Sequence, residues 1–297
     1  RTLDSHQLAV RLSYFLWSAP PDARLLGLAR SGKLNQPDVL ADEVERMIAD
    51  EKANEFVTGF VHQWLEMERL DFFQFDTKLF RDFDIPLTFF ACALALERNP
   101  EIAAAIRESG HDVCCHGWRW ERHWLLSEAE EREHIAKAVK SFQQTVGQTP
   151  AGWYCRYGPS VNTRRLVVEH GGFTYDSDYY GDELPFWQTV QGKPHLIVPY
   201  SLTNNDGKYA TTMSHSDQWF NFVKDAFDVL YKESSKHPKM MSVGMHMRIL
   251  GHPARTAGLW RLLDYLQQQK GVWITRRLDI ANHWLKVHPY KGKGLNE

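Results

Sequence analysis

Two short apolar runs decide the fold of this chain: Ile85-Pro86-Leu87-Thr88-Phe89-Phe90-Ala91 and Gly110-His111-Asp112-Val113-Cys114-Cys115-His116. The first is rich in β-branched and aromatic residues, which favour strands, and the second has the apolar centre Val113-Cys114-Cys115 and indicates the next strand and its end. Between them, Asn99-Pro100-Glu101 is typical of the start of a helix. A strand, a helix and a second strand in this order predict a βα unit with parallel pairing.

The same alternation continues to the end of the chain. Turn residues separate further strand-like runs from segments with helical spacing. We therefore predict an α/β fold over residues 85–297, with a mainly parallel sheet or a barrel. The predicted strands are 152–155, 174–177, 196–199, 241–246 and 272–275, and the predicted helices are 127–146, 162–170, 217–233 and 254–270.

Residues 1–84 follow a different pattern, which is helical throughout. Asp4 or Ser5 can cap a first helix, Asp22 suits the first turn of a second, and Pro37-Asp38 starts a third. A fourth helix is expected around Phe56–Leu65. We interpret Tyr14, Phe15, Trp17 and Trp64 as core residues of this part. The sequence thus predicts two domains: a small all-α segment, 1–84, and an α/β domain, 85–297.

Composition and charge narrow the functional class. The 297 residues carry a formal net charge of −2 with His neutral, so neither a nucleic-acid nor a membrane partner is expected. No apolar run approaches the roughly 18 residues of a membrane span. The four cysteines, Cys92, Cys114, Cys115 and Cys155, form no Cys-x-x-Cys pair, and we expect free thiols in the cytoplasm. Cys114 and Cys115 should face opposite sides of one strand.

Candidate site residues follow the ends of the predicted strands, where functional groups gather in parallel α/β folds. His116 follows one strand, Tyr154 and Arg156 lie at the end of another, and His246 and Arg248 at a third. A single histidine at a strand end is more often structural, but three such ends favour a site. Histidine suits acid–base work near neutral pH, and arginine can bind carbonyl or carboxylate oxygens.

The sequence does not decide the role of several other polar residues. Asp176 and Asp178 flank Ser177 and suit acid–base work or the capping of a turn equally well. His111 directly precedes a strand, and we expect it to fix local backbone. Asn204-Asn205-Asp206-Gly207 is typical of a turn.

The order of these motifs resembles the polysaccharide-deacetylase (NodB-like) family. The runs at 85–90 and 110–116, Asn162-Thr163-Arg164-Arg165-Leu166, Tyr175-Asp176-Ser177-Asp178 and His246 all fall in the family's order. Variants within them are similar to the cofactor-independent allantoinases. These variants are His116-Gly117-Trp118-Arg119-Trp120, Gly158-Pro159-Ser160-Val161-Asn162-Thr163-Arg164-Arg165, Asp182-Glu183-Leu184-Pro185-Phe186-Trp187 and Gly251-His252-Pro253-Ala254-Arg255. The likeness covers about two-thirds of the chain and implies a distorted (β/α) barrel.

The resemblance also bears on metal binding. Metal-using members of the family have a second histidine four residues after the first, and here that position is Trp120. An indole N–H is a donor only and cannot ligate a metal. We therefore predict no metal and no cofactor, with Trp120 lining the pocket for a flat polar ring.

An allantoinase-like site implies hydrolysis of a cyclic amide in a hydantoin-like small molecule, most directly allantoin to allantoate. By resemblance, His116 and His246 are the catalytic residues, with His246 as acid and base and His116 polarising the carbonyl or positioning water. Arg156, Arg248, Tyr154 and Trp120 would bind the substrate. Two alternatives stay open: an N-deacetylase of polysaccharide or peptidoglycan, and an inactive chimera or scaffold.

The chain departs from the family at its start. The family's first strand and its acidic motif have no equivalent before Ile85. Residues 5–84 resemble instead a helical domain of unknown function from planctomycete cytochrome-associated proteins. The two patterns meet near Asp84 and Ile85 without a linker, which suggests a chimera. A barrel without its first strand has unpaired edges, which either the helical segment or a second subunit could cover, and we expect a homo-oligomer.

Overall fold

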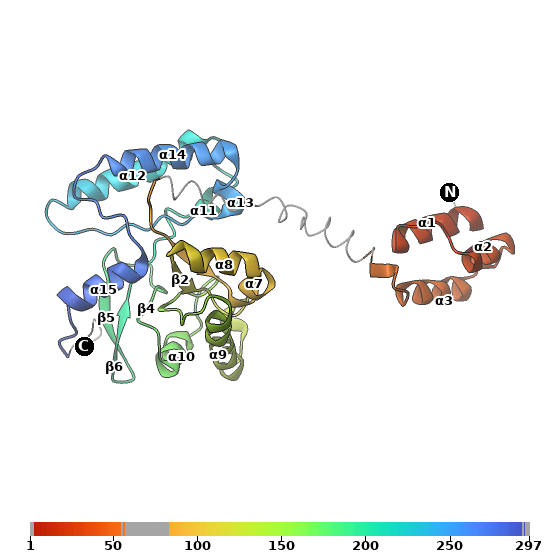
Figure 1. The fold of residues 1–297 in the computed structure, drawn as a ribbon, viewed down its shortest axis with the longest axis horizontal. Helices are drawn as coiled ribbons and strands as arrows, with labels where there is room; N and C mark the ends of the chain where they lie inside the picture. Colours follow the sequence, from red (N-terminus) through yellow and green to blue (C-terminus); the bar gives the residue numbers. More distant parts are fainter. Residues whose placement is uncertain (1–2, 55, 57–82, 293, 295–297) are drawn as a thin grey trace. The chain divides into compact units, whose positions relative to one another are not determined.

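A computed structural model describes residues 3–54, 56, 83–292 and 294 of the chain. The chain divides into two compact units, Arg1–Phe75 and Asp76–Glu297, and each is described by itself (Figure 1). The predicted domain boundary at Asp84/Ile85 and the predicted chimeric origin of the chain remain predictions.

The first unit is helical, as the sequence predicts. Its described elements are α1 (Ser5–Trp17), α2 (Ala23–Arg30), the 3-10 turn η1 (Lys33–Asn35) and α3 (Pro37–Ile48). Asp4 caps α1 by accepting from the Gln7 backbone N–H at 2.8 Å, and Asp22 caps α2 by accepting from Leu25 N–H at 2.8 Å. Both caps satisfy donors that the first helical turn leaves without a partner.

A small core holds these three helices together. Trp17 is buried and its indole Nε1 donates to the Met47 carbonyl at 2.8 Å. The prediction of a core role is wrong for Tyr14 and Phe15, which are 53% and 59% exposed. They lie on the face of α1 opposite Ala9, Ser13 and Leu16, and helical spacing alone does not show how wide the buried stripe is. Most of the predicted fourth helix and Trp64 lie outside the described residues.

The second unit alternates strands and helices. Its first half contains β1 (Thr88–Ala91), α7 (Ala93–Arg98), α8 (Pro100–Ser109), β2 (Asp112–Cys115), η2 (His123–Leu125), α9 (Glu128–Thr145), β3 (Gly152–Trp153) and α10 (Thr163–His170). Its second half contains β4 (Tyr175–Asp176), β5 (Phe186–Val190), β6 (Lys193–Ile197), α11 (Asp206–Tyr209), α12 (Ser216–Glu233), α13 (Met247–Leu250), α14 (Pro253–Gln267) and α15 (Arg277–Val287).

The six strands form one sheet in the order β1-β2-β3-β4-β6-β5. All neighbours pair in parallel except β5 and β6, which form an antiparallel hairpin. In the register, Ala91 lies beside Cys115 and Cys115 beside Trp153, so these carboxyl ends are aligned along one edge. The α/β class with a parallel-rich sheet is confirmed, and β1 lies at one end of the strand order.

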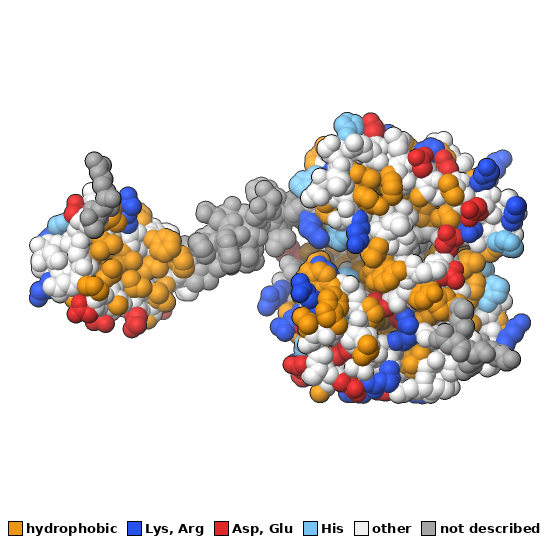
Figure 2. All heavy atoms as spheres, turned by 180° about the vertical axis from the view of Figure 1, so that it is seen from behind, with side chains coloured by type: hydrophobic (Ala, Val, Ile, Leu, Met, Phe, Trp, Pro, Cys, Tyr) orange, Lys and Arg blue, Asp and Glu red, His pale blue; other side chains and the backbone are white. Residues whose placement is uncertain are grey.

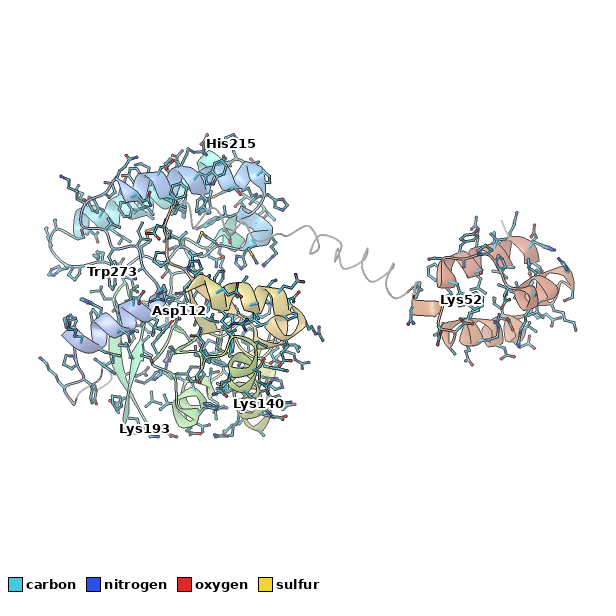
Figure 3. The ribbon with its side chains drawn as sticks, in the orientation of Figure 1. Lys52, Asp112, Lys140, Lys193, His215 and Trp273 are labelled. Atoms are coloured by element: carbon cyan, nitrogen blue, oxygen red, sulfur yellow. The ribbon has the colours of Figure 1, made fainter. Side chains whose placement is uncertain are left out.

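Helices cover both faces of this sheet (Figure 1). One core joins α7, α8, α9 and α10 to the sheet and contains Val113 and Cys115, and the other contains Cys114 with Ala281 of α15. The predicted opposite orientation of Cys114 and Cys115 is thereby confirmed, and all four cysteines are free and buried. Asp112, labelled in Figure 3, connects the layers because it accepts from Thr88 Oγ1 at 3.0 Å and from the Leu278 N–H at 3.3 Å.

Three local predictions differ from the structure. Residues 241–246 and 272–275 form no strand, and within them Gly244 makes a single bridge, to Asn205. A strand needs a neighbouring ladder, which an apolar run does not itself provide. The hairpin strand β5 was not predicted: Phe186 and Trp187 were considered only as the end of a family motif, and residues 188–190 were assigned to no element.

The surface agrees with the near-neutral composition. On the face of the larger unit seen in Figure 2, acidic and basic side chains are interspersed. Among the described residues, no helix has the length and apolar character that crossing a membrane requires.

Candidate active site

His116 lies directly after β2, at the aligned strand ends. Its Nδ1 is 2.6 Å from the Tyr154 carbonyl, and its ring stacks on the Tyr154 ring with centroids 5.2 Å apart. Because a carbonyl oxygen only accepts, Nδ1 carries the proton and Nε2 keeps a free lone pair. Burial, reinforced by the charges of Arg156 and His246, lowers the pKa of His116 to about 4. Its imidazole is therefore neutral near pH 7.

His246 is held by a carboxylate instead of a carbonyl. Its Nδ1 lies 2.5 Å from Asp206 Oδ1, and its backbone N–H donates to Asp206 Oδ2 at 2.8 Å. The Asp206 side chain is only 1% exposed, whereas that of His246 is 29% exposed. The carboxylate thus fixes the ring and its tautomer, and the opposite nitrogen, Nε2, is left to act on a substrate.

An irregular backbone contact brings Asp206 to His246. Asn205 and Gly244 form an isolated parallel bridge, in which the Asp206 N–H donates to the Gly244 carbonyl at 3.0 Å. A Cβ at position 244 would lie 2.1 Å from the Tyr200 hydroxyl. Only glycine fits here, so this close approach sets the position of the segment that ends in His246.

Trp120 connects the predicted residues. Its ring lies edge-on to His116 with centroids 6.5 Å apart. The guanidinium carbon of Arg156 lies 3.5 Å from the Trp120 ring centroid, and that of Arg248 lies 5.6 Å from it. Trp120 is 51% exposed, so a flat ligand could stack on its indole.

The structure therefore brings the predicted residues together around one indole and one imidazole. His116, Trp120, Tyr154, Arg156 and Arg248 are connected by ring and cation–π contacts, and His246 is close enough to lower the pKa of His116. The Tyr154 ring supports His116, and its hydroxyl accepts from Tyr180 at 3.3 Å. The assignment of each residue to catalysis or substrate binding remains a proposal.

Sequence reasoning missed two residues of this site. Asp206 was interpreted as part of a plain turn, although an acidic residue near a strand end is a signal that could have been weighed. Tyr157 was not considered; its hydroxyl accepts from Trp120 Nε1 at 3.3 Å, and its ring lies 3.2 Å from the Arg156 guanidinium carbon. Tyr157 has φ of 68°, a conformation that sequence alone does not reveal for a tyrosine.

The residues around His116 do not fit a divalent metal. The position that would provide a second imidazole holds the Trp120 indole, whose only polar atom donates. Asp206 is engaged with His246, and no cluster of three or more potential ligands occurs among the described residues. A zinc site needs three or four such ligands, so we derive no step through a metal.

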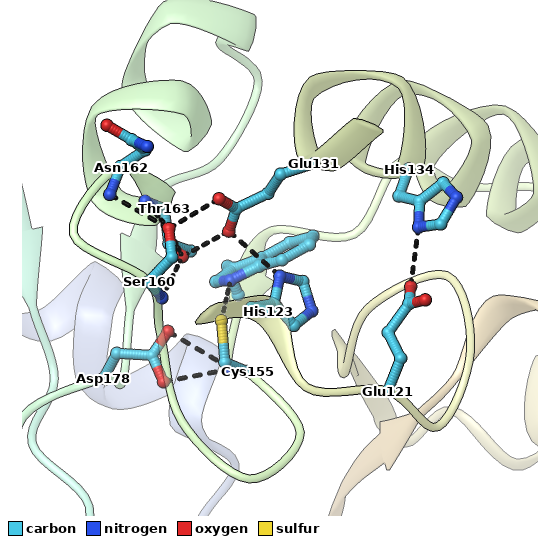
Figure 4. Close-up of polar contacts among 10 residues, drawn as sticks. Glu121, His123, Glu131, His134, Cys155, Ser160, Asn162, Thr163 and Asp178 are labelled. Carbon is cyan, nitrogen blue, oxygen red and sulfur yellow. Dashed lines mark hydrogen bonds and ion pairs between the residues drawn. The ribbon is translucent and has the colours of Figure 1, made fainter. Parts of the chain in front are cut away.

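A second buried network lies behind the loop that follows His116 (Figure 4). His123 Nδ1 lies 3.0 Å from Glu131 Oε1, and Glu131 also accepts from Ser160 Oγ at 2.6 Å and from Thr163 Oγ1. His123 and Glu131 are fully buried. Gly117 packs on this ring, since a Cβ there would lie 3.0 Å from His123 Nε2. The network holds the loop between His116 and Trp120 in place.

Asp176 and Asp178 are placed behind the site. Asp176 binds Arg164 Nε at 2.7 Å and His195 Nε2 at 2.9 Å. Asp178 accepts from the Cys155 N–H at 3.0 Å, and burial together with Asp176 raises its pKa. Both carboxylates thus support the strand ends that precede Arg156. His111 accepts from the Leu87 N–H at 3.3 Å, which confirms its backbone role.

Comparison with family models matches two segments of the chain. Residues 3–105 match a protein family of unknown function (DUF1592), and residues 76–175 match the polysaccharide deacetylase model. These matches confirm the resemblance of the helical segment to a domain of unknown function and of the α/β domain to polysaccharide deacetylases.

Individual relatives agree with the second match. A putative polysaccharide deacetylase of Schizosaccharomyces pombe is 38% identical over 232 residues, 72% of each chain, and a peptidoglycan deacetylase of Helicobacter pylori is 24% identical over 72% of this chain and 84% of its own. Among solved structures, PuuE allantoinase is 47% identical with a TM-score of 0.69, covering 72% of each chain. A probable polysaccharide deacetylase of Pseudomonas aeruginosa PAO1 is 46% identical with the same TM-score and coverage.

Proposed function

This chain belongs to the polysaccharide deacetylase family, and we propose that within it the chain hydrolyses a cyclic amide, with the hydantoin ring of allantoin as the leading substrate. One observation carries the proposal. Trp120, which by the family resemblance stands where metal-using members have a second histidine, presents an exposed indole beside two guanidiniums and the His116 imidazole. That arrangement suits a flat, polar ring without metal assistance.

The chemistry follows from the two imidazoles. Water attacks a ring carbonyl, an oxyanion develops, the C–N bond breaks and the ring nitrogen leaves with a proton. His246 accepts the proton of the water at Nε2 and returns it to the leaving nitrogen, while Asp206 stabilises the imidazolium between these steps. The lone pair of His116 Nε2 holds the attacking water, because its proton is committed to the Tyr154 carbonyl. Arg156 and Arg248 donate to the oxyanion.

The direct test is an allantoin-hydrolysis assay with purified protein. Allantoate formation that persists after dialysis against a chelator and is lost in His246→Ala supports the proposal. If the folded protein leaves allantoin intact, or if turnover needs zinc to return after chelation, the proposal is wrong.

A second candidate is N-deacetylation of an acetylated sugar polymer. It is favoured by the names of the yeast and P. aeruginosa relatives, and an acyclic acetamide needs the same attack by water. Acetate release from N-acetylated chitin or peptidoglycan oligomers, with allantoin unchanged, would favour this candidate. If the folded protein neither hydrolyses allantoin nor releases acetate, both candidate functions are wrong and a non-catalytic scaffold is favoured.

A further inference from the structure

Three arginines converge on the exposed rings of the site. Arg156 lies 3.5 Å from the Trp120 centroid and 3.2 Å from that of Tyr157, Arg248 lies 5.6 Å from Trp120, and Arg122 lies 5.8 Å from Tyr157. Positive charges repel one another, so three guanidiniums around two rings cost free energy unless something negative joins them.

No carboxylate of the described residues forms an ion pair with any of these three arginines. Glu121, the acidic neighbour of Arg122 in the sequence, is already engaged by Arg119 Nε at 3.0 Å and by His134 Nδ1 at 2.7 Å. Asp206 is committed to His246. The acidic groups on the nearby loops are thus committed to other partners, and burial together with Arg248 lowers the pKa of Arg156.

The stacking leaves the guanidinium donors available. A guanidinium over an aromatic ring presents its flat face to the ring, while its N–H groups point outward in its own plane. Arg156 Nε is a buried donor without a hydrogen-bond partner among the described residues. A carboxylate can accept two such N–H groups at once, which neither a carbonyl nor a hydroxyl does as well.

We propose that this arginine cluster, Arg122, Arg156 and Arg248 around Trp120 and Tyr157, binds a carboxylate carried by the substrate beside the amide that is cleaved. The inference rests on the proposed hydrolysis of a cyclic amide and refines its substrate: allantoin has no carboxylate, so a hydantoin or ureide that carries one should be preferred to allantoin. Hydrolysis of the amide creates a second carboxylate, and the same cluster lies where that negative charge develops.

Binding tests the inference without turnover. Titration calorimetry compares N-carbamoylglycine, an anion, with N-carbamoylglycinamide, its neutral amide of nearly equal size. We expect the anion to bind roughly tenfold more tightly or better. Arg248→Gln should remove most of this preference, whereas Arg132→Gln, which alters an arginine paired with Glu128 and Glu169 on the surface, should leave it unchanged. Equal affinity for both ligands, or an unaltered preference in Arg248→Gln, overturns the inference.

Arg156→Lys is a milder change at a second arginine of the cluster, so the inference does not depend on the folding of Arg248→Gln alone. It keeps the charge but loses the planar fork, so the preference for the anion should fall several-fold while the far-UV spectrum stays the same. An unchanged preference there counts against Arg156 as a carboxylate ligand.

Turnover separates this inference from the proposed function. Hydantoin-5-acetic acid and its acetamide share one scissile ring, and we expect a kcat/KM for the acid about tenfold above that for the amide. If both are hydrolysed equally well and bind equally, the proposed function stands and the carboxylate site is refuted. If neither is hydrolysed but N-carbamoylglycine still depends on Arg248, the carboxylate site stands and the hydantoinase function is refuted.

Discussion

The two histidines of the site sit in contrasting surroundings. His116 ends a regular parallel strand, contacts a backbone carbonyl and is held neutral by burial. His246 ends an irregular segment, contacts a carboxylate and reaches solvent more freely. A carbonyl fixes one tautomer and favours the protonated ring too weakly to offset burial at His116, whereas a carboxylate also stabilises the protonated ring by its charge. The partner atom therefore assigns the roles: His246 is suited to transfer protons, and His116 to hold a water.

Replacing His246 tests its proposed role in proton transfer, for which we expect the largest effect. In His246→Ala, the group proposed to transfer protons is gone, and we expect kcat to fall by about 10³-fold. The measurement is allantoin turnover beside circular dichroism of the folded protein. His237→Ala, at an exposed histidine elsewhere in the unit, is the control and should keep full turnover. Turnover within a few-fold of the wild type would exclude His246 from the chemistry.

Asp206→Asn tests whether the charge of the Asp206 carboxylate assists proton transfer, in addition to orienting the His246 ring. The amide can still accept a hydrogen bond from Nδ1 but carries no charge to stabilise the imidazolium, so we expect kcat to fall by about 10²-fold with little change in KM. Asp217→Asn, at an exposed carboxylate in the first turn of α12, serves as the matched control. A KM effect alone would mean that Asp206 shapes the pocket without assisting proton transfer.

The low pKa of His116 predicts a pH dependence of stability. Its imidazole has a pKa of about 4 in the folded protein, against 6.5 for an ordinary histidine, so the unfolded chain binds the proton more readily. The free energy of unfolding should therefore decrease as pH falls from about 6.5 to about 4, by about 3 kcal/mol, and this contribution should not change further below that range. Urea titrations at pH 7 and pH 4.5 measure the decrease in the free energy of unfolding. In His116→Gln, the part of this decrease that His116 contributes should be absent. An equal decrease in both proteins would contradict a neutral, buried His116.

Tyr200→Phe gives the smallest expected effect. The Tyr200 hydroxyl accepts from Asn205 Nδ2 at 2.9 Å and packs against Gly244, so it supports the bridge that positions Asp206. Loss of one hydrogen bond should cost about 1 kcal/mol of unfolding free energy and lower kcat a few-fold. Chemical denaturation and the allantoin assay measure the two effects together. A stability loss with unchanged kcat would show that the bridge positions His246 without this hydroxyl.

Much of the β2 side of the site could be predicted from sequence. The period of two in Asp112–Cys115 places Cys114 and Cys115 on opposite faces, and the end of the run places His116 at the sheet edge. These conclusions need only local geometry, because a strand alternates its side chains and parallel strands align their ends. The same reasoning predicted that Arg156 lies at the end of the adjacent strand.

The other side depended on contacts between distant parts of the chain. The sequence identified His246 by its resemblance to a family motif, but it described residues 241–246 as a strand and Asp206 as part of a turn. The structure joins the two through one bridge at Gly244, although the carboxylate and the imidazole are 40 positions apart in the chain. Local periodicity carries no information about such a pairing, because it depends on contacts between segments far apart in the chain, such as the close approach of Gly244 to Tyr200. The sequence by itself determined which imidazoles are available; only the tertiary structure decided that one binds a carbonyl and the other a carboxylate.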